Sequence, residues 1–314
     1  MKAIKEFWKL YPAWFYVISS LMFIFFYKTN MPANSYSTSA FIFPFAFFVL
    51  FALVEGNEKN NKYYPLILIS IVLIIWGTIT KLVPPLNFSQ ETIKVLYEIT
   101  NISLIILLII HGIIYLTKKE VIYFFVISLL YGLALESSGI MLGFFSENDF
   151  HLYIPLFKAP LVTMLGWTGI FYTTYFIFSN IKKINFKPFQ TIIIGAFTIS
   201  IIALFWDISI DPIASSKFIN FWKWNELLPL QPGFLGVPIL NFISWFWAVF
   251  IYAIGLLHIY KKNYSQPKSY YVLIISVILA QIVSGFFTFA TMAIIEGING
   301  PTMTILLHFL KKTF

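Results

Sequence analysis

The stretch W-D-I-S-I-D-P at 206–212, followed by W-K-W at 222–224 and G-V-P-I-L-N-F-I-S-W at 236–245, is the most informative part of this chain. It places two acids at the end of a long apolar segment and then inserts a polar loop. The chain returns to apolar sequence through a proline that lies seven residues before a tryptophan. An acid embedded in apolar sequence is costly in a membrane, so Asp207 and Asp211 are candidates for function.

A second copy of this arrangement lies upstream. Its proline and tryptophan, Pro160 and Trp167, each lie 78 positions before their counterparts, and Glu136 lies 71 positions before Asp207. The loop of the downstream copy is therefore seven residues longer. We predict a tandem internal repeat, with halves at approximately 121–180 and 189–260.

The composition of the chain indicates a membrane protein. Hydrophobic residues make up 59% of it and charged residues 11%, and the mean hydropathy is +0.83, a balance that soluble domains do not have. Apolar segments long enough to cross a bilayer recur along the whole length. We therefore predict an all-α polytopic membrane protein, a single domain over residues 1–314. About nine transmembrane helices are expected, at 12–27, 37–54, 63–83, 95–116, 121–143, 156–180, 189–210, 236–260 and 270–295. The segment 298–310 is either a short interfacial helix or the end of the last span.

The positive charge follows the membrane topology. All 21 basic residues are Lys, and they gather in short loops, so the net charge of +8 fits the positive-inside rule and predicts no nucleic-acid partner. The loops at 117–120, 181–188 and 261–269 are predicted to be cytoplasmic, together with the N-terminus. The loop at 211–235 then lies on the opposite side of the cell membrane. This orientation places the embedded acids of both copies in the non-cytoplasmic half.

Several catalytic classes lack their motifs in this sequence. It contains no G-x-S-x-G, P-loop, G-x-G-x-x-G or H-E-x-x-H, and without Cys it has no thiolate metal site. The D-x-x-x-D of Asp207 and Asp211 is also typical of the Mg²⁺–diphosphate motifs of membrane prenyltransferases. That chemistry normally uses a second Asp-rich cluster and several cations, so a prenyltransferase stays an alternative.

Single residues of some conspicuous types carry less information. A Trp near the end of a span is most often an interfacial residue, and His111 and His258 are better explained as partners of neighbouring side chains than as ligands. Glu136 and Asp207 differ, because each follows a largely apolar run of ten or more residues. We therefore expect these acids to be functional.

Three stretches resemble a known family. W-D-I-S-I-D-P-I-A, with W-K-W and G-V-P-I-L-N-F-I-S-W-F, resembles the C-terminal signature of the CruF-type carotenoid biosynthesis proteins. That family includes membrane carotenoid hydratases and bisanhydrobacterioruberin hydratase. G-L-A-L-E-S-S-G-I-M-L-G at Gly132–Gly143 and A-P-L-V-T-M-L-G-W at Ala159–Trp167 resemble its first signature. The resemblance covers about residues 120–260.

The resemblance implies acid-catalysed hydration of a carotenoid or polyisoprenoid end group. A carboxylic acid protonates a terminal alkene only in its neutral form, which an apolar environment favours, and water then captures the tertiary cation. Aromatic faces stabilise such a cation, and Asn241 would hold the water or orient a carboxyl. No metal or organic cofactor is required, and the lipophilic substrate arrives from the bilayer. The expected catalytic residues are Glu136, Asp207 and Asp211, and the expected substrate-binding residues are Trp206, Trp222, Trp224, Trp245, Tyr153 and Asn241.

Other functions remain open from the sequence. A cyclase would use the same protonation but capture the cation with a neighbouring double bond. A transport or binding protein would use the paired acids as an ion site, although transporters typically carry inverted repeats and these two copies are predicted to share one orientation. Under the hydratase interpretation, the two halves should converge on one cavity.

Overall fold

The computed structural model describes most of the chain from residue 88 onward. The described residues are 8–13, 15, 19, 88–147, 150–157, 159–180, 188–216, 219–228, 233–234, 236–262 and 266–313. The expected spans at 37–54 and 63–83, and most of the span at 12–27, lie outside the described residues.

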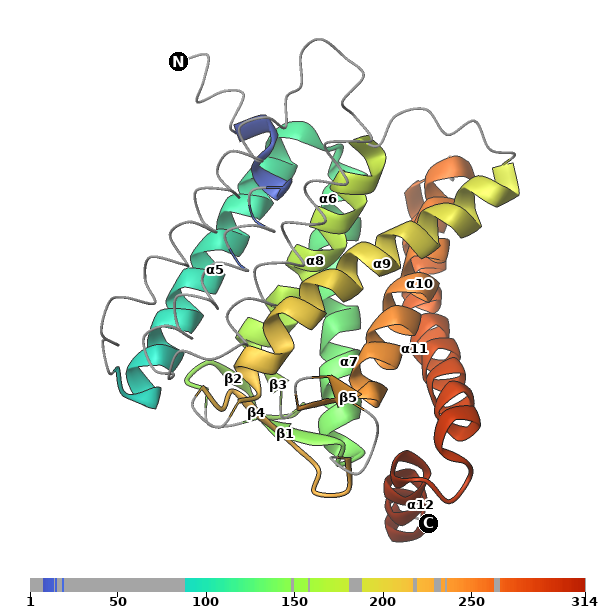
Figure 1. The fold of residues 1–314 in the computed structure, drawn as a ribbon. Helices are drawn as coiled ribbons and strands as arrows, with labels where there is room; N and C mark the ends of the chain where they lie inside the picture. Colours follow the sequence, from blue (N-terminus) through green and yellow to red (C-terminus); the bar gives the residue numbers. More distant parts are fainter. Residues whose placement is uncertain are drawn as a thin grey trace.

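Long apolar helices dominate the described residues and pack side by side (Figure 1). Six segments within these residues are long and apolar enough to cross a membrane, which confirms the prediction of an all-α membrane protein. The helices are α5 (Gln90–Tyr115), α6 (Lys118–Ile122), α7 (Ser128–Met141), α8 (Leu161–Asn180), α9 (Pro188–Ala214), α10 (Ile239–Lys262) and α11 (Gln266–Glu296). A π-helical stretch, η2 (Tyr123–Ile127), joins α6 to α7 in one span, and α12 (Pro301–Thr313) is a separate short helix.

The start of α5 and the start of α6 follow from capping residues. Ser89 accepts a hydrogen bond from the backbone of Thr92 at the start of α5. After the extended residue Leu116, Thr117 and Glu120 form a capping box that begins α6. The break between the two spans is therefore only two residues long.

Two helix boundaries differ from the sequence expectation. The helix expected from residue 156 begins at Leu161, because Ala159–Pro160 pair as a strand instead. The span expected at 189–210 continues as a helix through Pro212 to Ala214. Pro212 lies in the last turn of α9. The backbone hydrogen bond that proline cannot donate is therefore missing only near the end of the helix, so the helix is not broken before Pro212.

Three small two-stranded sheets were not predicted. They lie together at the end of the bundle where α7 and α9 finish (Figure 1). All three sheets are antiparallel: β1 (Phe145–Glu147) pairs with β4 (Trp222–Trp224), β2 (Tyr153–Ile154) with β3 (Ala159–Pro160), and β5 (Gly233–Phe234) with β6 (Val237–Pro238).

The order of these elements repeats. A helix, a strand, a short hairpin and a second helix occur once as α7, β1, β2–β3 and α8, and again as α9, β4, β5–β6 and α10. The equivalent strands β1 and β4 pair with each other, with Ser146 opposite Lys223. These two strands therefore run antiparallel where the two halves meet, and α7 and α9 lead into their loops at the same end of the bundle (Figure 1).

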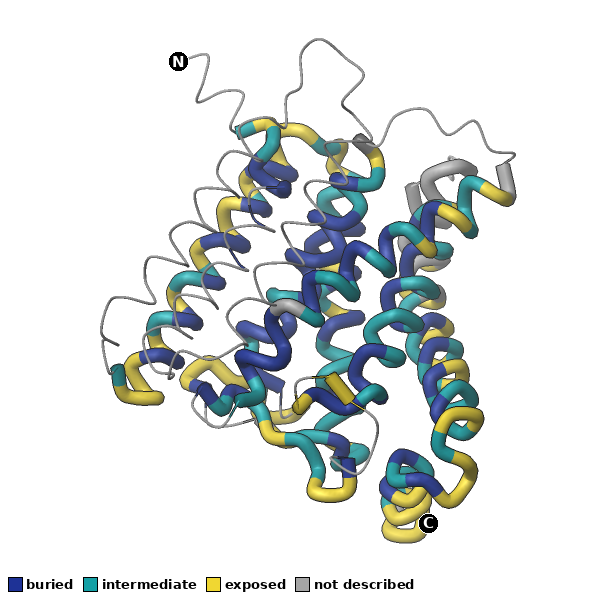
Figure 2. The backbone as a smooth tube through the Cα atoms, in the orientation of Figure 1, coloured by how far each residue is buried: buried dark blue, intermediate teal, exposed yellow. Residues whose placement is uncertain are grey.

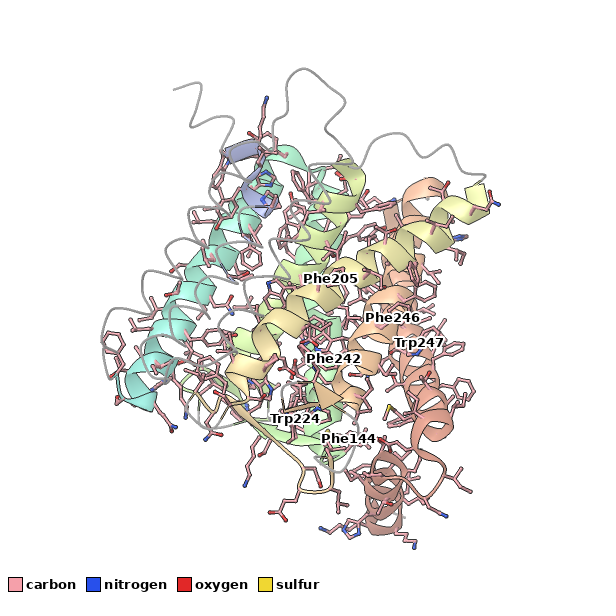
Figure 3. All side chains as sticks on the ribbon, in the orientation of Figure 1. Phe144, Phe205, Trp224, Phe242, Phe246 and Trp247 are labelled. Atoms are coloured by element: carbon pink, nitrogen blue, oxygen red, sulfur yellow. The ribbon has the colours of Figure 1, made fainter. Side chains whose placement is uncertain are left out.

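The buried core lies between the helices of the two halves, whereas α5 and α11 expose apolar side chains on their outer faces (Figure 2). Ile113 is 62% exposed and Phe286 is 67% exposed, as expected for faces in contact with lipid. Aromatic side chains also join α10 to α11 (Figure 3): the rings of Trp247 and Phe287 stack with centroids 4.6 Å apart.

Candidate functional site

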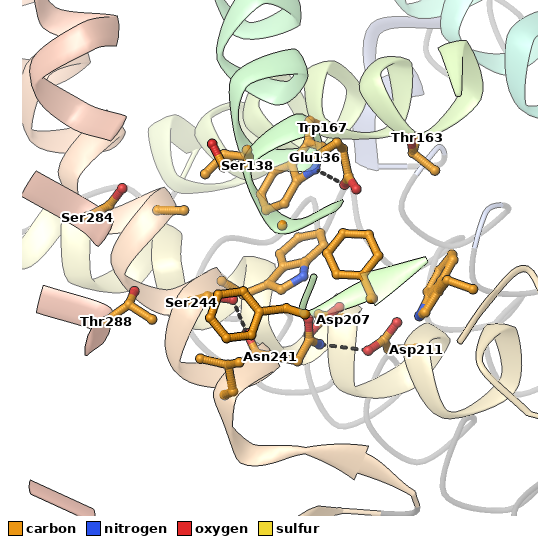
Figure 4. Close-up of a pocket in the computed structure, with 18 of the residues that line it drawn as sticks. Glu136, Ser138, Thr163, Trp167, Asp207, Asp211, Asn241, Ser244, Ser284 and Thr288 are labelled. Carbon is orange, nitrogen blue, oxygen red and sulfur yellow. Dashed lines mark hydrogen bonds between the residues drawn. The ribbon is translucent and has the colours of Figure 1, made fainter. Parts of the chain in front are cut away.

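A pocket lies where α7, α8, α9, α10 and α11 approach the strands β1 and β4 (Figure 4). It brings together the acids of both halves: Glu136 from α7, and Asp207 and Asp211 from α9. Four tryptophans that were expected to bind substrate also line it, together with the repeat tryptophan of the first half: Trp206, Trp222, Trp224, Trp245 and Trp167.

Asp207 and Asp211 point from one face of α9, one turn apart, as their spacing predicted. Both are 3% exposed. Asn241, in the first turn of α10, donates from Nδ2 to Asp207 Oδ2 at 2.8 Å and to Asp211 Oδ2 at 2.7 Å. Of the two roles that the sequence left open for Asn241, this geometry corresponds to orienting carboxyl groups.

Glu136 is held by the other half-site. The indole Nε1 of Trp167 on α8 donates to Glu136 Oε1 at 2.5 Å. Gly132, one turn before Glu136, permits this contact: a Cβ at this position would lie 2.7 Å from the Cβ of Trp167. The absence of a side chain at Gly132 therefore lets α7 and α8 approach closely enough to place the acid against the indole.

Tryptophan rings form one wall of the pocket. Trp167 and Trp245, which are equivalent in the two halves, stack on each other with centroids 4.0 Å apart and planes 22° apart. The ring centroids of Trp206 and Trp245 lie 5.9 Å apart. The indole Nε1 of Trp206 donates to the hydroxyl of Ser19 at 3.0 Å rather than to a carboxyl group. These rings line the same pocket as the acids, and an aromatic ring beside a positive charge stabilises it.

The strand β4 supplies a further part of the lining. Trp222 and Trp224 lie two residues apart, so their side chains project from the same face of the strand, and both line the pocket. The indole of Trp222 donates a hydrogen bond to Asp211, and Trp224 packs edge-on against Phe145 of β1. The loops therefore fold back over the ends of α7 and α9.

One expected substrate-binding residue lies outside this pocket. Tyr153 lies in β2 opposite Pro160, is 39% exposed and is not among the pocket-lining residues. The structure therefore does not place Tyr153 among the acids and tryptophans of this pocket. Its role in substrate binding stays a prediction.

The sequence argument also missed the contribution of α11. Gln281, Ser284 and Thr288 line the pocket, and Ser284 and Thr288 approach it from the side opposite Asp211 (Figure 4). Their spacing of three and four residues places them on one helix face. Polar side chains at that spacing within an otherwise apolar span were the signal that could have found them.

The charges of the lining restrict its ligands. Its acidic side chains are the three carboxyl groups and the phenol of Tyr97, and none of its residues is Lys, Arg or His. Among the residues that the structure describes, no group of three His, Asp or Glu side chains is arranged to hold a metal ion. Without a basic side chain, the lining favours an apolar or cationic group over an anionic diphosphate.

The fold and this pocket define a class: a polytopic helical membrane protein whose two similar halves place carboxyl groups against tryptophan rings. The family model for the carotenoid biosynthesis proteins matches residues 94–310, and the chain belongs to this family. The matched region includes every residue of the pocket lining. Comparison with curated proteins found no match, and neither did comparison with solved structures.

Proposed function

We propose that this protein is a carotenoid or polyisoprenoid end-group hydratase, which protonates a terminal double bond and adds water to give a tertiary alcohol. One observation carries the proposal: three buried or partly buried carboxyl groups from the two halves line one pocket walled by tryptophan rings. Membership of the carotenoid biosynthesis family makes a lipophilic polyene the natural ligand of such a pocket.

The proton donor is assigned to the pair on α9. Asp207 and Asp211 share one amide donor, so they are close enough for a proton on one of them to be stabilised by the other. In the proposed step, Asp207 gives its proton to the terminal carbon of a trisubstituted alkene. The C=C π bond breaks, a C–H bond forms, and the adjacent carbon becomes a tertiary carbocation.

The tryptophan wall stabilises this carbocation. Each aromatic face contributes about 0.5–2 kcal/mol to a nearby cation when the site is desolvated. The stacked rings of Trp167 and Trp245 and the ring of Trp206 supply such faces beside the carboxyl groups. The rings stabilise the cation through their π electrons until water captures it.

Water then completes the reaction. Glu136, oriented by Trp167, accepts a proton from the water that attacks the cation, and a C–O bond forms. The net change is the addition of one water to one double bond, and the proton taken from Asp207 is restored by transfer from Glu136 through the pocket. No external oxidant or reductant is needed.

The test is conversion of an acyclic carotene in membranes that contain the protein, in H₂¹⁸O. A hydratase adds the mass of one water and places ¹⁸O in a tertiary hydroxyl group. A cyclase, which shares the protonation step, gives an unlabelled ring with the mass of the substrate. Unlabelled cyclic product would replace the hydratase proposal with the cyclase, and absence of any conversion would contradict both.

A further inference from the structure

The α11 side of the pocket carries polar groups that the proposed protonation does not use. Gln281, Ser284 and Thr288 line the pocket, and no other polar side chain lies between them in α11. Polar side chains inside a membrane span are costly and rarely placed without a partner or a ligand. The hydrogen bonds of this face therefore indicate which chemical group it is suited to bind.

The amide of Gln281 has a fixed orientation. Ser138 on α7 donates its only hydroxyl hydrogen to the carbonyl of Ala134 at 2.5 Å. The Ser138 oxygen is thus an acceptor toward Gln281, whose Nε2 donates to it at 2.9 Å. This arrangement turns the nitrogen of the amide toward α7. Oε1 must then accept its hydrogen bond from another group.

Gln281 Oε1 is a buried acceptor that receives no hydrogen bond from the residues that the structure describes. The nearby Ser284 does not supply one, because its hydroxyl donates to the backbone carbonyl of Gln281 at 3.2 Å and accepts from Tyr131 at 3.3 Å. A buried acceptor without a donor is unfavourable. The group that completes it is a donor brought in by a ligand or by water.

A buried donor lines the same pocket. The indole Nε1 of Trp224 is buried and donates to no acceptor in the described parts of the chain. Trp224 packs against a cluster that includes Leu240 and Met292, so it lies on the α10–α11 side of the pocket. The lining thus offers an unused acceptor and an unused donor in addition to the carboxyl groups.

We propose that the α11 side of the pocket is a subsite for a hydroxyl group, with Gln281 Oε1 as the acceptor of its hydrogen bond. A hydroxyl suits this side because it both donates and accepts, and because it is the smallest such group on an otherwise apolar ligand. The proposal rests on the proposed function, which requires an O–H in this pocket. That O–H belongs either to the attacking water and the alcohol it forms, or to a hydroxyl already present on the substrate.

Binding of two polyenes tests the subsite directly. The purified protein in lipid nanodiscs is titrated with an acyclic carotene and with its monohydroxylated derivative, a tertiary alcohol, and the shift of the polyene absorption is followed. The unaltered protein should bind the alcohol more tightly. Gln281→Met keeps the length of the side chain but cannot accept the hydrogen bond, so its affinity for the alcohol should fall by about tenfold, with the affinity for the carotene unchanged.

Two further variants control for misfolding. Ser138→Ala keeps Gln281 but removes the group that orients it, so it should lose a smaller part of the preference for the alcohol. Thr198→Val removes a hydroxyl from α9 that bonds only to its own helix and does not line the pocket, and it should bind both polyenes normally. Equal binding of carotene and alcohol by the unaltered protein, or an unchanged preference in Gln281→Met, would overturn the proposal.

Turnover separates the two sources of the hydroxyl. If Gln281 holds the attacking water, Gln281→Met slows hydration of the carotene and of the alcohol alike. If it holds a hydroxyl on the substrate, only conversion of the alcohol slows. Full activity of Asp207→Asn would contradict the proposed function but not the subsite, because a preference for the alcohol that Gln281→Met abolishes would still be measured by binding.

Discussion

The two halves of the repeat share a scaffold but differ in the chemistry that they present. The second half carries two carboxyl groups, Asp207 and Asp211, bridged by Asn241. In the first half, Ile140 stands at the position equivalent to Asp211, and Thr163 at the position equivalent to Asn241.

The side chains at these equivalent positions use their hydrogen bonds differently. Thr163 donates to the carbonyl of Pro160 at the start of its own helix, whereas Asn241 reaches across to the neighbouring helix. The single carboxyl group of the first half, Glu136, is held by the indole of Trp167 instead. The order of the elements is thus the same in both halves, whereas a few differences in side chains lead us to assign the proton donor to one half and the base to the other.

The largest expected effect concerns the orientation of the chain in the membrane, because a cysteine on one side reacts with an impermeant reagent from that side alone. Single Cys residues at Ser146 and Lys223, which are exposed and opposite each other in the β1–β4 pair, should both react with a membrane-impermeant maleimide from the non-cytoplasmic side only. The native chain has no Cys, so it is the unlabelled control. Reaction from the cytoplasmic side would reverse the topology inferred from the Lys residues.

The next largest effect is expected at the proposed proton donor. Asp207→Asn preserves the shape of the side chain and part of its hydrogen bonding but cannot donate a strongly acidic proton. Product formation should fall by about 10²-fold or more, with little loss of folded protein. The measurement is the initial rate of product formation per amount of folded protein, and an unchanged rate would remove Asp207 from the mechanism.

Exchanging the residues that differ between the halves should give a smaller effect. Asn241→Thr removes the donor shared by Asp207 and Asp211, and activity should fall by about tenfold, on the scale of a lost hydrogen bond to a charged or polar partner. Thr163→Val, at the equivalent position, removes only a bond to Pro160 and should change activity little. Equal losses in the two variants would mean that Asn241 acts through packing rather than through the carboxyl groups.

The smallest effect should come from the loops that close each half. Hydrogen bonds to Glu98 and then to Glu91 raise the pKa of His151 above its usual value. The stabilisation that protonated His151 contributes is therefore complete below the unfolded value of about 6.5 and is lost as the pH rises through the raised folded value.

The difference in thermal midpoint between the unaltered protein and His151→Ala should accordingly shrink as the pH rises above about 6.5. The loop of the second half is held instead by Asn225, which donates to the carbonyl of Gly143 at 2.7 Å and does not titrate. The deficit of Asn225→Ala should stay constant over the same range. A pH-independent deficit in His151→Ala would show that its ion pairs do not stabilise the loop.

The length of the apolar segments was sufficient to predict the described spans, and the similarity of the two halves led to the expectation that their acids meet in one cavity. The four-residue spacing predicted that Asp207 and Asp211 share a face of α9, and their common donor Asn241 confirms it. His111 likewise proved to be a partner of its neighbours, bonded to Tyr172 at 2.8 Å. These features depend on one helix at a time, or on the composition of one span.

Features that depend on contacts between distant segments could not be predicted. The short strands carry no pattern of their own, and β1 and β4 are defined only by their pairing between the two halves. The contact between Glu136 and Trp167 depends on the close approach of two helices at Gly132. The position of Tyr153 outside the pocket also depends on such a contact, since Tyr153 pairs with Pro160 in the β2–β3 sheet.

The measurement that tests the account most directly is a double-mutant cycle between the two halves. Product formation is compared for the unaltered protein, Glu136→Gln, Asp207→Asn and the double variant, at equal amounts of folded protein. If the two acids act on one reacting group, the double variant should be no slower than the slower single variant. Losses that multiply as for independent sites, or full activity in either single variant, would contradict a catalytic site built jointly by both halves.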